Sequence, residues 1–170
     1  MKEVLTIGFV ATAISPYFSE EQQVRIKSEN HLKKIIAEYD TKLICFHKTI
    51  FSKEDSVEAE KFFKNKIDFL ILQTSSCSSG EQLYPLCNIT NKMGLWAVPD
   101  LENEGDVKLH SLVSVSHYLG IIKKILHEKK IKTKWFYNYG DTDEFKNKFL
   151  ITLRSLLADK KIKQSKIGLV

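Results

Sequence analysis

The residues best suited to hold a ligand lie in one short loop, residues 74–80, with the sequence Thr-Ser-Ser-Cys-Ser-Ser-Gly. The loop follows the most apolar segment of the chain and precedes a segment with helical character. Hydroxyl groups and free backbone N–H groups ahead of a helix suit an anion or a polyol. The same small residues are also typical of a tight turn that binds nothing. From the residues alone, both interpretations stay open.

Several well-defined catalytic motifs do not occur in the chain. It contains neither G-x-G-x-x-G nor G-x-x-x-x-G-K-[ST], which argues against dinucleotide and P-loop nucleotide sites. A cysteine phosphatase built on Cys77 would need an arginine six residues later, and that residue is Leu83. The five histidines lack the spacing of metal ligands. We therefore expect no catalytic residue and no metal site within this sequence.

Composition is that of an ordinary globular domain. The chain has 170 residues, of which 43% are hydrophobic and 28% charged, with three prolines and seven glycines. This excludes a disordered chain and a disulfide scaffold. No apolar run approaches the ~18 residues that span a membrane, and the first residues lack a signal-peptide pattern. Three cysteines without C-x-x-C spacing fit a reduced chain, so we expect a cytoplasmic protein with no membrane partner.

Positive charge is concentrated in the last third of the chain. The formal net charge is +5, and residues 121–170 hold 13 Lys and Arg against 5 Asp and Glu. A nucleic-acid interface would need these lysines on one face together with an exposed Trp135 or Tyr137. We expect a central strand to bury both aromatic side chains, and we therefore predict no nucleic-acid partner.

Strand-like and helix-like segments alternate along almost the whole chain. Apolar runs predict five strands, around residues 4–10, 43–46, 67–73, 93–98 and 135–137. Helical periodicity fills the intervals, for example in the apolar stripe at positions 112, 115, 119, 122 and 126. The alternation predicts an α/β fold, a doubly wound, mainly parallel five-stranded sheet with helices on both faces, flavodoxin-like or Rossmann-like. Ligands of such sheets bind at the carboxyl ends of the strands.

Polar segments predict where helices begin and where the domain ends. Ser19 starts an S-x-x-Q capping box, while Ser52 and residues 141–144 offer further caps. The final residues, 166–170, are similar in sequence to the first strand. We therefore expect residues 1–165 to form one α/β domain and residues 166–170 to start a second, truncated domain. A sixth strand at the edge of the sheet is the alternative.

The opening of the chain has a distinctive spacing, in which Phe9 and Val10 are followed by Tyr17 and then Glu20. This spacing is similar to the F-V-x-G-S-Q-x-L-Y-G-x-E opening of arabinose isomerases, with other residues in place of the Gly, Ser and Gln. The segment 68–80 is similar to the strand and loop of fucose isomerases that carry T-P-C-W-C-Y-G. The loop keeps the Thr and the Gly and has a cysteine where the tryptophan stands.

Later segments continue the series in the same order. Residues 94–99, Gly-Leu-Trp-Ala-Val-Pro, are similar to a strand of fucose-isomerase-like proteins, and residues 110–112 are similar to the helix start that follows it. Residues 166–170 are similar to the strand R-I-G-L-I-G that opens the second domain of these enzymes. Together the segments resemble, over the whole chain, the N-terminal domain of the L-fucose/L-arabinose isomerase superfamily.

The resemblance implies a function and a set of site residues. Complete members interconvert an aldose and a ketose with a divalent metal, usually Mn²⁺, whose carboxylate and histidine ligands lie in later domains. Their N-terminal domain contributes oligomer contacts and reaches the sugar bound in a neighbouring subunit. We therefore expect a domain of a homo-oligomeric sugar isomerase that is inactive alone and holds no cofactor itself. The residues expected to contact the sugar substrate are Tyr17, Thr74, Ser76, Cys77 and Ser111.

The alternative is a stand-alone flavodoxin-like module that binds or senses a small molecule or anion at residues 74–80. In the isomerase reading, Tyr17, Ser76, Cys77 and Ser111 should line one cleft at the carboxyl edge of the sheet. Tyr17 could instead pack as a hydrophobic staple against the helix that follows it. Residues 167–170 should be weakly anchored, because no helix follows to cover them.

Overall fold

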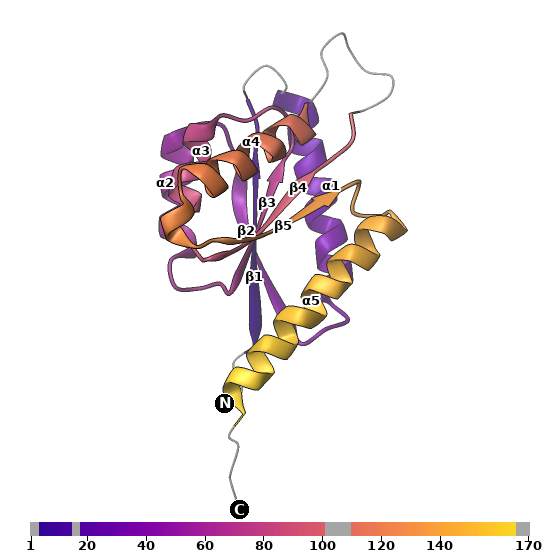
Figure 1. The fold of residues 1–170 in the computed structure, drawn as a ribbon. Coiled ribbons are helices and arrows are strands. Elements are labelled where there is room, and N and C mark those ends of the chain that lie inside the picture. Colours follow the sequence, from indigo (N-terminus) through magenta and orange to yellow (C-terminus); the bar gives the residue numbers. More distant parts are fainter. Residues whose placement is uncertain (1–3, 15–17, 101–109, 166–170) are drawn as a thin grey trace, which may run out of the picture.

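The chain folds around one five-stranded sheet in a computed structural model that describes residues 4–14, 18–100 and 110–165 (Figure 1). The strands are β1 (Leu5–Thr12), β2 (Thr41–Ile50), β3 (Phe69–Thr74), β4 (Lys92–Ala97) and β5 (Lys132–Tyr137). All neighbouring strands are parallel, and their order across the sheet is β2-β1-β3-β4-β5. This doubly wound, flavodoxin-like sheet confirms the predicted fold class.

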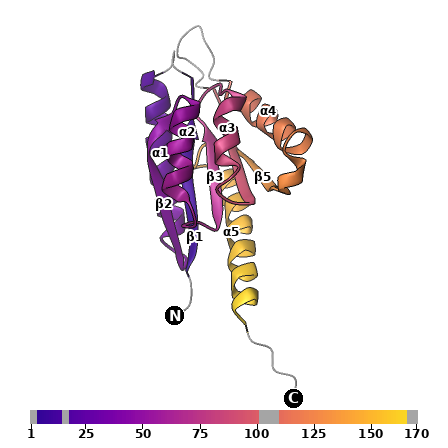
Figure 2. The ribbon, with the colours of Figure 1, turned by 90° about the vertical axis from the view of Figure 1, so that its left-hand side faces the viewer.

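Helices cover both faces of the sheet. They are α1 (Phe18–Ile36), α2 (Lys53–Phe63), α3 (Gly80–Leu86), α4 (Ser111–Lys124) and α5 (Asp143–Gln164), with a 3-10 turn, η2 (His127–Lys129), before β5. Helices α2, α3 and α4 pack on one face, and α1 and α5 pack on the other (Figure 2). Within the described residues, no helix has the length and apolar character needed to cross a membrane.

Strand β3 is buried along its whole length, because it lies between β1 and β4 in the sheet and between the two helical layers. Leu70 joins the apolar cluster on the α2–α4 side, and Ile71 joins the cluster on the α1–α5 side. On that second side the rings of Trp96 and Phe145 are stacked, with centroids 4.2 Å apart. Continuous apolar runs are what a parallel strand covered on both faces requires.

Side-chain caps explain where two of the helices begin. Asp55 N donates to Ser52 Oγ at 3.1 Å, and Ser52 N donates to Asp55 Oδ2 at 3.2 Å, which completes a capping box at α2. Thr142 caps α5 by accepting a hydrogen bond from the backbone N–H of Phe145. These two predicted caps are confirmed. Helix α1 begins at Phe18, one residue before Ser19, so the predicted helix start is displaced by one residue.

Helix α4 buries a different stripe from the predicted one. Val115 and Ile122 are buried as predicted, but Leu112 is 44% exposed and Tyr118 is buried instead. The physical reason is the buried hydroxyl of Ser111, which bonds to the end of the sheet and turns that side of the helix inwards. A polar anchor therefore fixes the rotation of α4, and apolar periodicity alone does not reveal it.

Strand β5 is an edge strand, which corrects the expectation of a central one. Trp135 is consequently 46% exposed, and Lys148 Nζ lies 3.8 Å from the centroid of its ring. Tyr137 is half-buried. Exposed lysines such as Lys132 and Lys134 are common on edge strands, where their charge opposes pairing with another sheet.

Helix α5 runs diagonally to the amino end of the sheet, where ion pairs hold it (Figure 1). Lys160 Nζ lies 2.8 Å from Asp68 Oδ2 and 2.9 Å from the carbonyl oxygen of Val4. Lys92 Nζ lies 2.5 Å from Asp159 Oδ2. The hydrogen bond from Lys92 is the main reason why the pKa of Asp159 is lowered to about 2.

Gly94→Ala should destabilise the protein by about 1–3 kcal/mol, because a methyl group there overpacks the core. An added Cβ would lie 2.8 Å from ring atoms of both Phe136 and Phe69. Gly120→Ala is the matched control, since a Cβ on this exposed helical residue meets nothing within 4 Å. The free energy of unfolding of the control should be about 0.4–1 kcal/mol higher than that of the parent protein. Urea denaturation of both variants measures the difference, and equal stabilities would contradict the packing.

Candidate functional site at the carboxyl edge

Thr74 and Ser111 meet at the carboxyl end of β3. Thr74 Oγ1 donates to the carbonyl oxygen of Ser111 at 2.9 Å, and Ser111 Oγ donates to the carbonyl oxygen of Thr74. Ser111 Oγ also accepts from the backbone N–H of Val98 at 2.9 Å. Thr74 is fully buried and Ser111 is 1% exposed. The pair therefore joins β3, the end of β4 and the start of α4.

The loop after β3 is tied to α4 and to the loop after β1. Ser78 N donates to Ser114 Oγ at 2.7 Å, and Ser78 Oγ donates to Thr12 Oγ1 at 3.0 Å. The backbone N–H of Ile14 donates to Ser76 Oγ at 3.2 Å. Ser76 and Ser78 are both buried. Most hydroxyls of this loop thus serve as internal connections.

Gln82 and Tyr118 complete the buried polar network. Gln82 Nε2 donates to the carbonyl oxygen of Ala13 at 2.9 Å, and Tyr118 OH lies 3.3 Å from Gln82 Oε1. Tyr118 OH also donates to the carbonyl oxygen of Ser79 at 3.2 Å. Burial raises the pKa of the Tyr118 phenol, so this group stays a neutral donor. Neither residue was expected from the sequence, because each occupies a position that also suits an ordinary core residue.

Two backbone N–H groups of the predicted anion cradle, residues 74–80, and the N–H group of Glu81 just after it have side-chain partners. Ser78 N donates to Ser114 Oγ, Ser79 N donates to Gln82 Oε1 and Glu81 N donates to Ser79 Oγ. These amides are therefore occupied at the start of α3. The small residues of the loop allow this close internal bonding, as the turn interpretation requires.

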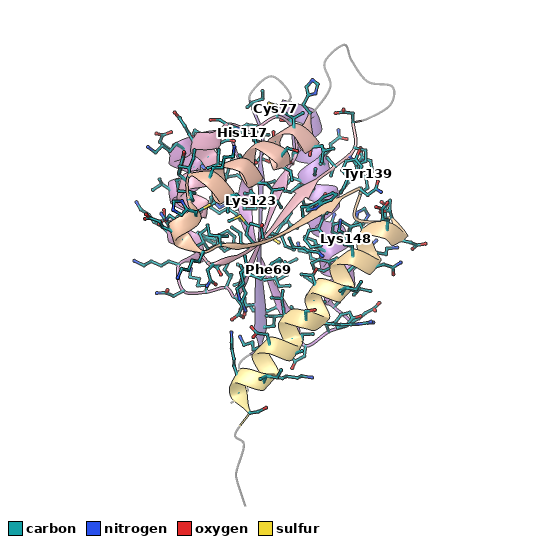
Figure 3. All side chains as sticks on the ribbon, viewed as in Figure 1. Phe69, Cys77, His117, Lys123, Tyr139 and Lys148 are labelled. Atoms are coloured by element: carbon teal, nitrogen blue, oxygen red, sulfur yellow. The ribbon has the colours of Figure 1, made fainter. Side chains whose placement is uncertain are left out.

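Cys77 differs from its neighbours, because it is half-buried while Thr74, Ser76 and Ser111 are buried. These four candidates come together at the carboxyl edge, where Cys77 lies above α3 and α4 (Figure 3). The fifth, Tyr17, lies outside the described residues, as do residues 167–170. Among the four described candidates, Cys77 is the side chain best able to touch a ligand.

The described part of the edge does not fit a Mn²⁺ site. Hard divalent ions take carboxylate, carbonyl and imidazole ligands, whereas this edge offers hydroxyls that already have protein partners. In the described ranges no group of three or more His, Cys, Asp and Glu side chains could hold a metal ion. No chemical step through a metal is therefore assigned to these residues.

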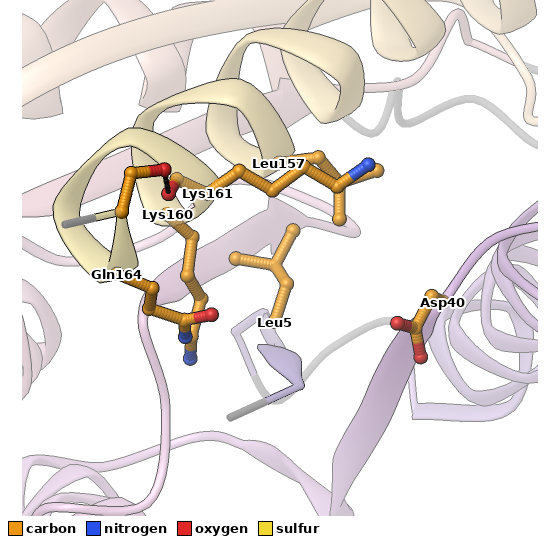
Figure 4. Close-up of a pocket in the computed structure, with 7 residues that line it drawn as sticks. Leu5, Asp40, Leu157, Lys160, Lys161 and Gln164 are labelled. Atoms are coloured by element: carbon orange, nitrogen blue, oxygen red, sulfur yellow. Dashed lines mark hydrogen bonds between the residues drawn. The ribbon is translucent and has the colours of Figure 1, made fainter. Parts of the chain in front are cut away.

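A cavity of about 410 Å³ lies at the opposite, amino edge of the sheet (Figure 4). It is bordered by Leu5 at the start of β1, by Asp40 and by Leu157, Lys160 and Lys161 of α5. Lys160 already pairs with Asp68, so its ammonium group has a structural partner. This cavity is remote from the carboxyl-edge loops and shares no residue with them.

Comparison with known proteins gives this chain no family. No protein-family model matches the sequence, and no curated protein matches it. The site must therefore be interpreted from its own geometry and from the resemblance of its segments.

Ser111→Ala should cost about 1–3 kcal/mol of stability, because it leaves the buried Val98 N–H and Thr74 carbonyl without this partner. Ser116→Ala is the matched control on the same helix, where an exposed hydroxyl bonds only to the carbonyl of Leu112. The control should stay within about 0.5 kcal/mol of the parent protein. Chemical denaturation measures the free energy of unfolding of both variants. An unchanged value for Ser111→Ala would contradict the structural role of the Ser111 hydroxyl.

Alkylation should discriminate between the three cysteines. Burial raises the pKa of the Cys45 and Cys87 thiols to about 12, so little reactive thiolate forms below that pH. At mildly alkaline pH, iodoacetamide should modify Cys77 first, and peptide mass spectrometry locates the adduct. Protein unfolded in guanidinium is the control, in which all three thiols should react alike. Native Cys87 reacting as fast as Cys77 would refute the prediction.

Proposed function

We propose that this chain is the sugar-contacting, N-terminal domain of a metal-dependent aldose–ketose isomerase. One observation carries the proposal: the segments that resemble such enzymes converge on one edge and bond directly to each other. Thr74 joins Ser111, and the N–H of Ile14 joins Ser76. Segments that share one ligand site need this proximity.

In this function the described residues position the sugar. Isomerisation moves a proton between C1 and C2 and needs a base and a polarised oxygen, which a bound Mn²⁺ helps to supply in enzymes of this type. The carboxyl edge instead offers one half-buried thiol at Cys77, which a network of buried and partnered hydroxyls holds in place. The metal ligands would come from other parts of the protein.

The site would work between subunits of a homo-oligomer. The rigid network fixes the loop after β3 through Ser76, Ser78 and Ser114, so the loop can present Cys77 to a sugar held mainly by a neighbour. A contact that acts equally on bound sugar and transition state lowers KM without changing kcat. This domain is therefore expected to govern sugar affinity.

The test uses the protein encoded by the complete gene, assayed with Mn²⁺ on L-fucose, L-arabinose and other aldoses. Cys77→Ala should raise KM about 2- to 10-fold with little change in kcat, because a uniform binding contact is lost. Cys45→Ala, at a half-buried thiol on β2, is the matched control and should leave both constants unchanged. The 170-residue chain alone should show no turnover.

Two results would overturn the proposal. One is the absence of ketose formation from every aldose by the complete protein, and the other is turnover by the 170-residue chain alone. If the Cys77→Ala variant is active with an unchanged KM, the proposed isomerase activity stands but Cys77 does not contact the sugar.

A further inference from the structure

A small cavity of about 250 Å³ lies between α1 and the loop that joins β5 to α5. Its lining combines apolar, donor and acceptor groups: Val24, Lys27, Ser28 and His31 from α1, and Tyr139 and Asp141 from the loop. It belongs to the α1–α5 side of the sheet, where Tyr139 lies, while Cys77 lies above the other helical layer (Figure 3). None of its lining residues belongs to the hydroxyl network of the α3 and α4 side.

Hydrogen bonds hold the loop side of the cavity in place. Trp96 Nε1 donates to the carbonyl oxygen of Asn138 at 2.8 Å, and Tyr139 OH donates to that of Pro99 at 2.9 Å. Thr142 Oγ1 donates to the carbonyl oxygen of Tyr139 at 2.8 Å. The cavity wall is therefore formed in advance, which lowers the ordering cost of binding a small ligand.

The helix side presents polar groups that still have bonding capacity. Ser28 is 2% exposed and its Oγ accepts from Gln73 Nε2, which leaves the hydroxyl proton for an acceptor. Nδ1 of His31 is buried against the loop, since a Cβ added at Gly140 would lie 3.1 Å from it, and it has no hydrogen-bond partner in the described residues. Gly140 packs so closely that an added Cβ would lie 2.7 Å from His31 Cβ. The loop and the imidazole are thus fitted to each other.

We propose that this cavity binds one neutral monosaccharide or small polyol. The charges of Lys27 and Asp141 on its wall cancel, so the site favours neither an anion nor a cation. Each hydroxyl of a polyol both donates and accepts, which matches the Lys27 ammonium and the Ser28 hydroxyl on the helix side and the Asp141 carboxylate on the loop side. Val24 and the Tyr139 ring offer an apolar surface for the C–H face of the sugar.

Size and charge argue against other ligands. The volume lies below the ~300–1,000 Å³ of pockets for drug-sized molecules, so a nucleotide or an oligosaccharide is too large. A sugar phosphate would meet Asp141 in the lining and Asp100, which lies close enough to act on the Tyr139 phenol. A small inorganic anion would be attracted by the Lys27 ammonium and repelled by the Asp141 carboxylate, so the cavity does not favour it.

This inference rests on the proposed function for the class of ligand, while the cavity itself supplies the location and the size. It adds a second sugar contact on the α1–α5 side of the sheet. Gln73 connects Ser28 to the loop after β3, because its Nε2 donates to Ser28 Oγ and its Oε1 accepts from Ser75 Oγ at 3.2 Å.

The experiment is a ¹H–¹⁵N NMR titration of the 170-residue chain with L-fucose, L-arabinose and xylitol at millimolar concentrations. Shift changes are expected at the lining residues, which are Val24, Lys27, Ser28, His31, Tyr139 and Asp141. Lys27→Ala and Asp141→Ala should each weaken binding by about 5-fold or more, since each removes a charged hydrogen-bonding group. Both side chains belong to exposed residues, so the variants should fold. Lys34→Ala, exposed on the same helix outside the cavity, is the matched control.

Three outcomes would overturn the inference: no shift change at the cavity residues, shift changes only around residues 74–78 and 111, or equal changes with a sugar phosphate. The second would leave the proposed function standing. Conversely, the complete protein could bind sugar at the cavity and show no isomerase activity. That result would support the cavity as a sugar site and contradict the proposed function.

Discussion

The burial of β3 governs the organisation of this protein. All six residues of the strand are buried, and the loop that follows it is also largely inside. A buried polar group without a partner costs about 1–3 kcal/mol, so each one must find a partner within the protein. Gln73, Thr74 and the serines after them therefore bond to the ends of β1 and β4 and to helices α1 and α4.

That constraint limits what the carboxyl edge can offer to a ligand. Hydroxyls that connect loops are oriented and rigid, but they have little bonding capacity left for a substrate. Ser111 illustrates this, because its single hydroxyl contacts both Thr74 and Val98. The ligand contacts that we propose therefore lie at the margin of the network, at the half-buried Cys77, and in the cavity whose wall contains Ser28.

The strand order places β5 at the edge of the sheet, and this position decides which of its side chains are exposed. Because β5 is added outside β4, Trp135 remains partly exposed beside Lys148 and the strand carries charged lysines at its margin. The loop after β5 leads to α5 on the same face of the sheet as α1, where Gly140 packs closely against His31.

The sequence by itself determined the fold class, because continuous apolar runs alternating with helical periodicity admit few arrangements other than a doubly wound parallel sheet. It also determined local features, such as the caps at Ser52 and Thr142, whose bonds span only three residues. Contacts between distant segments were decided by the tertiary structure alone. They include the pairing of Thr74 with Ser111, the rotation of α4 and the exposure of Trp135. Local patterns carry no information on which distant polar group satisfies a buried one, nor on which strand stands at the edge.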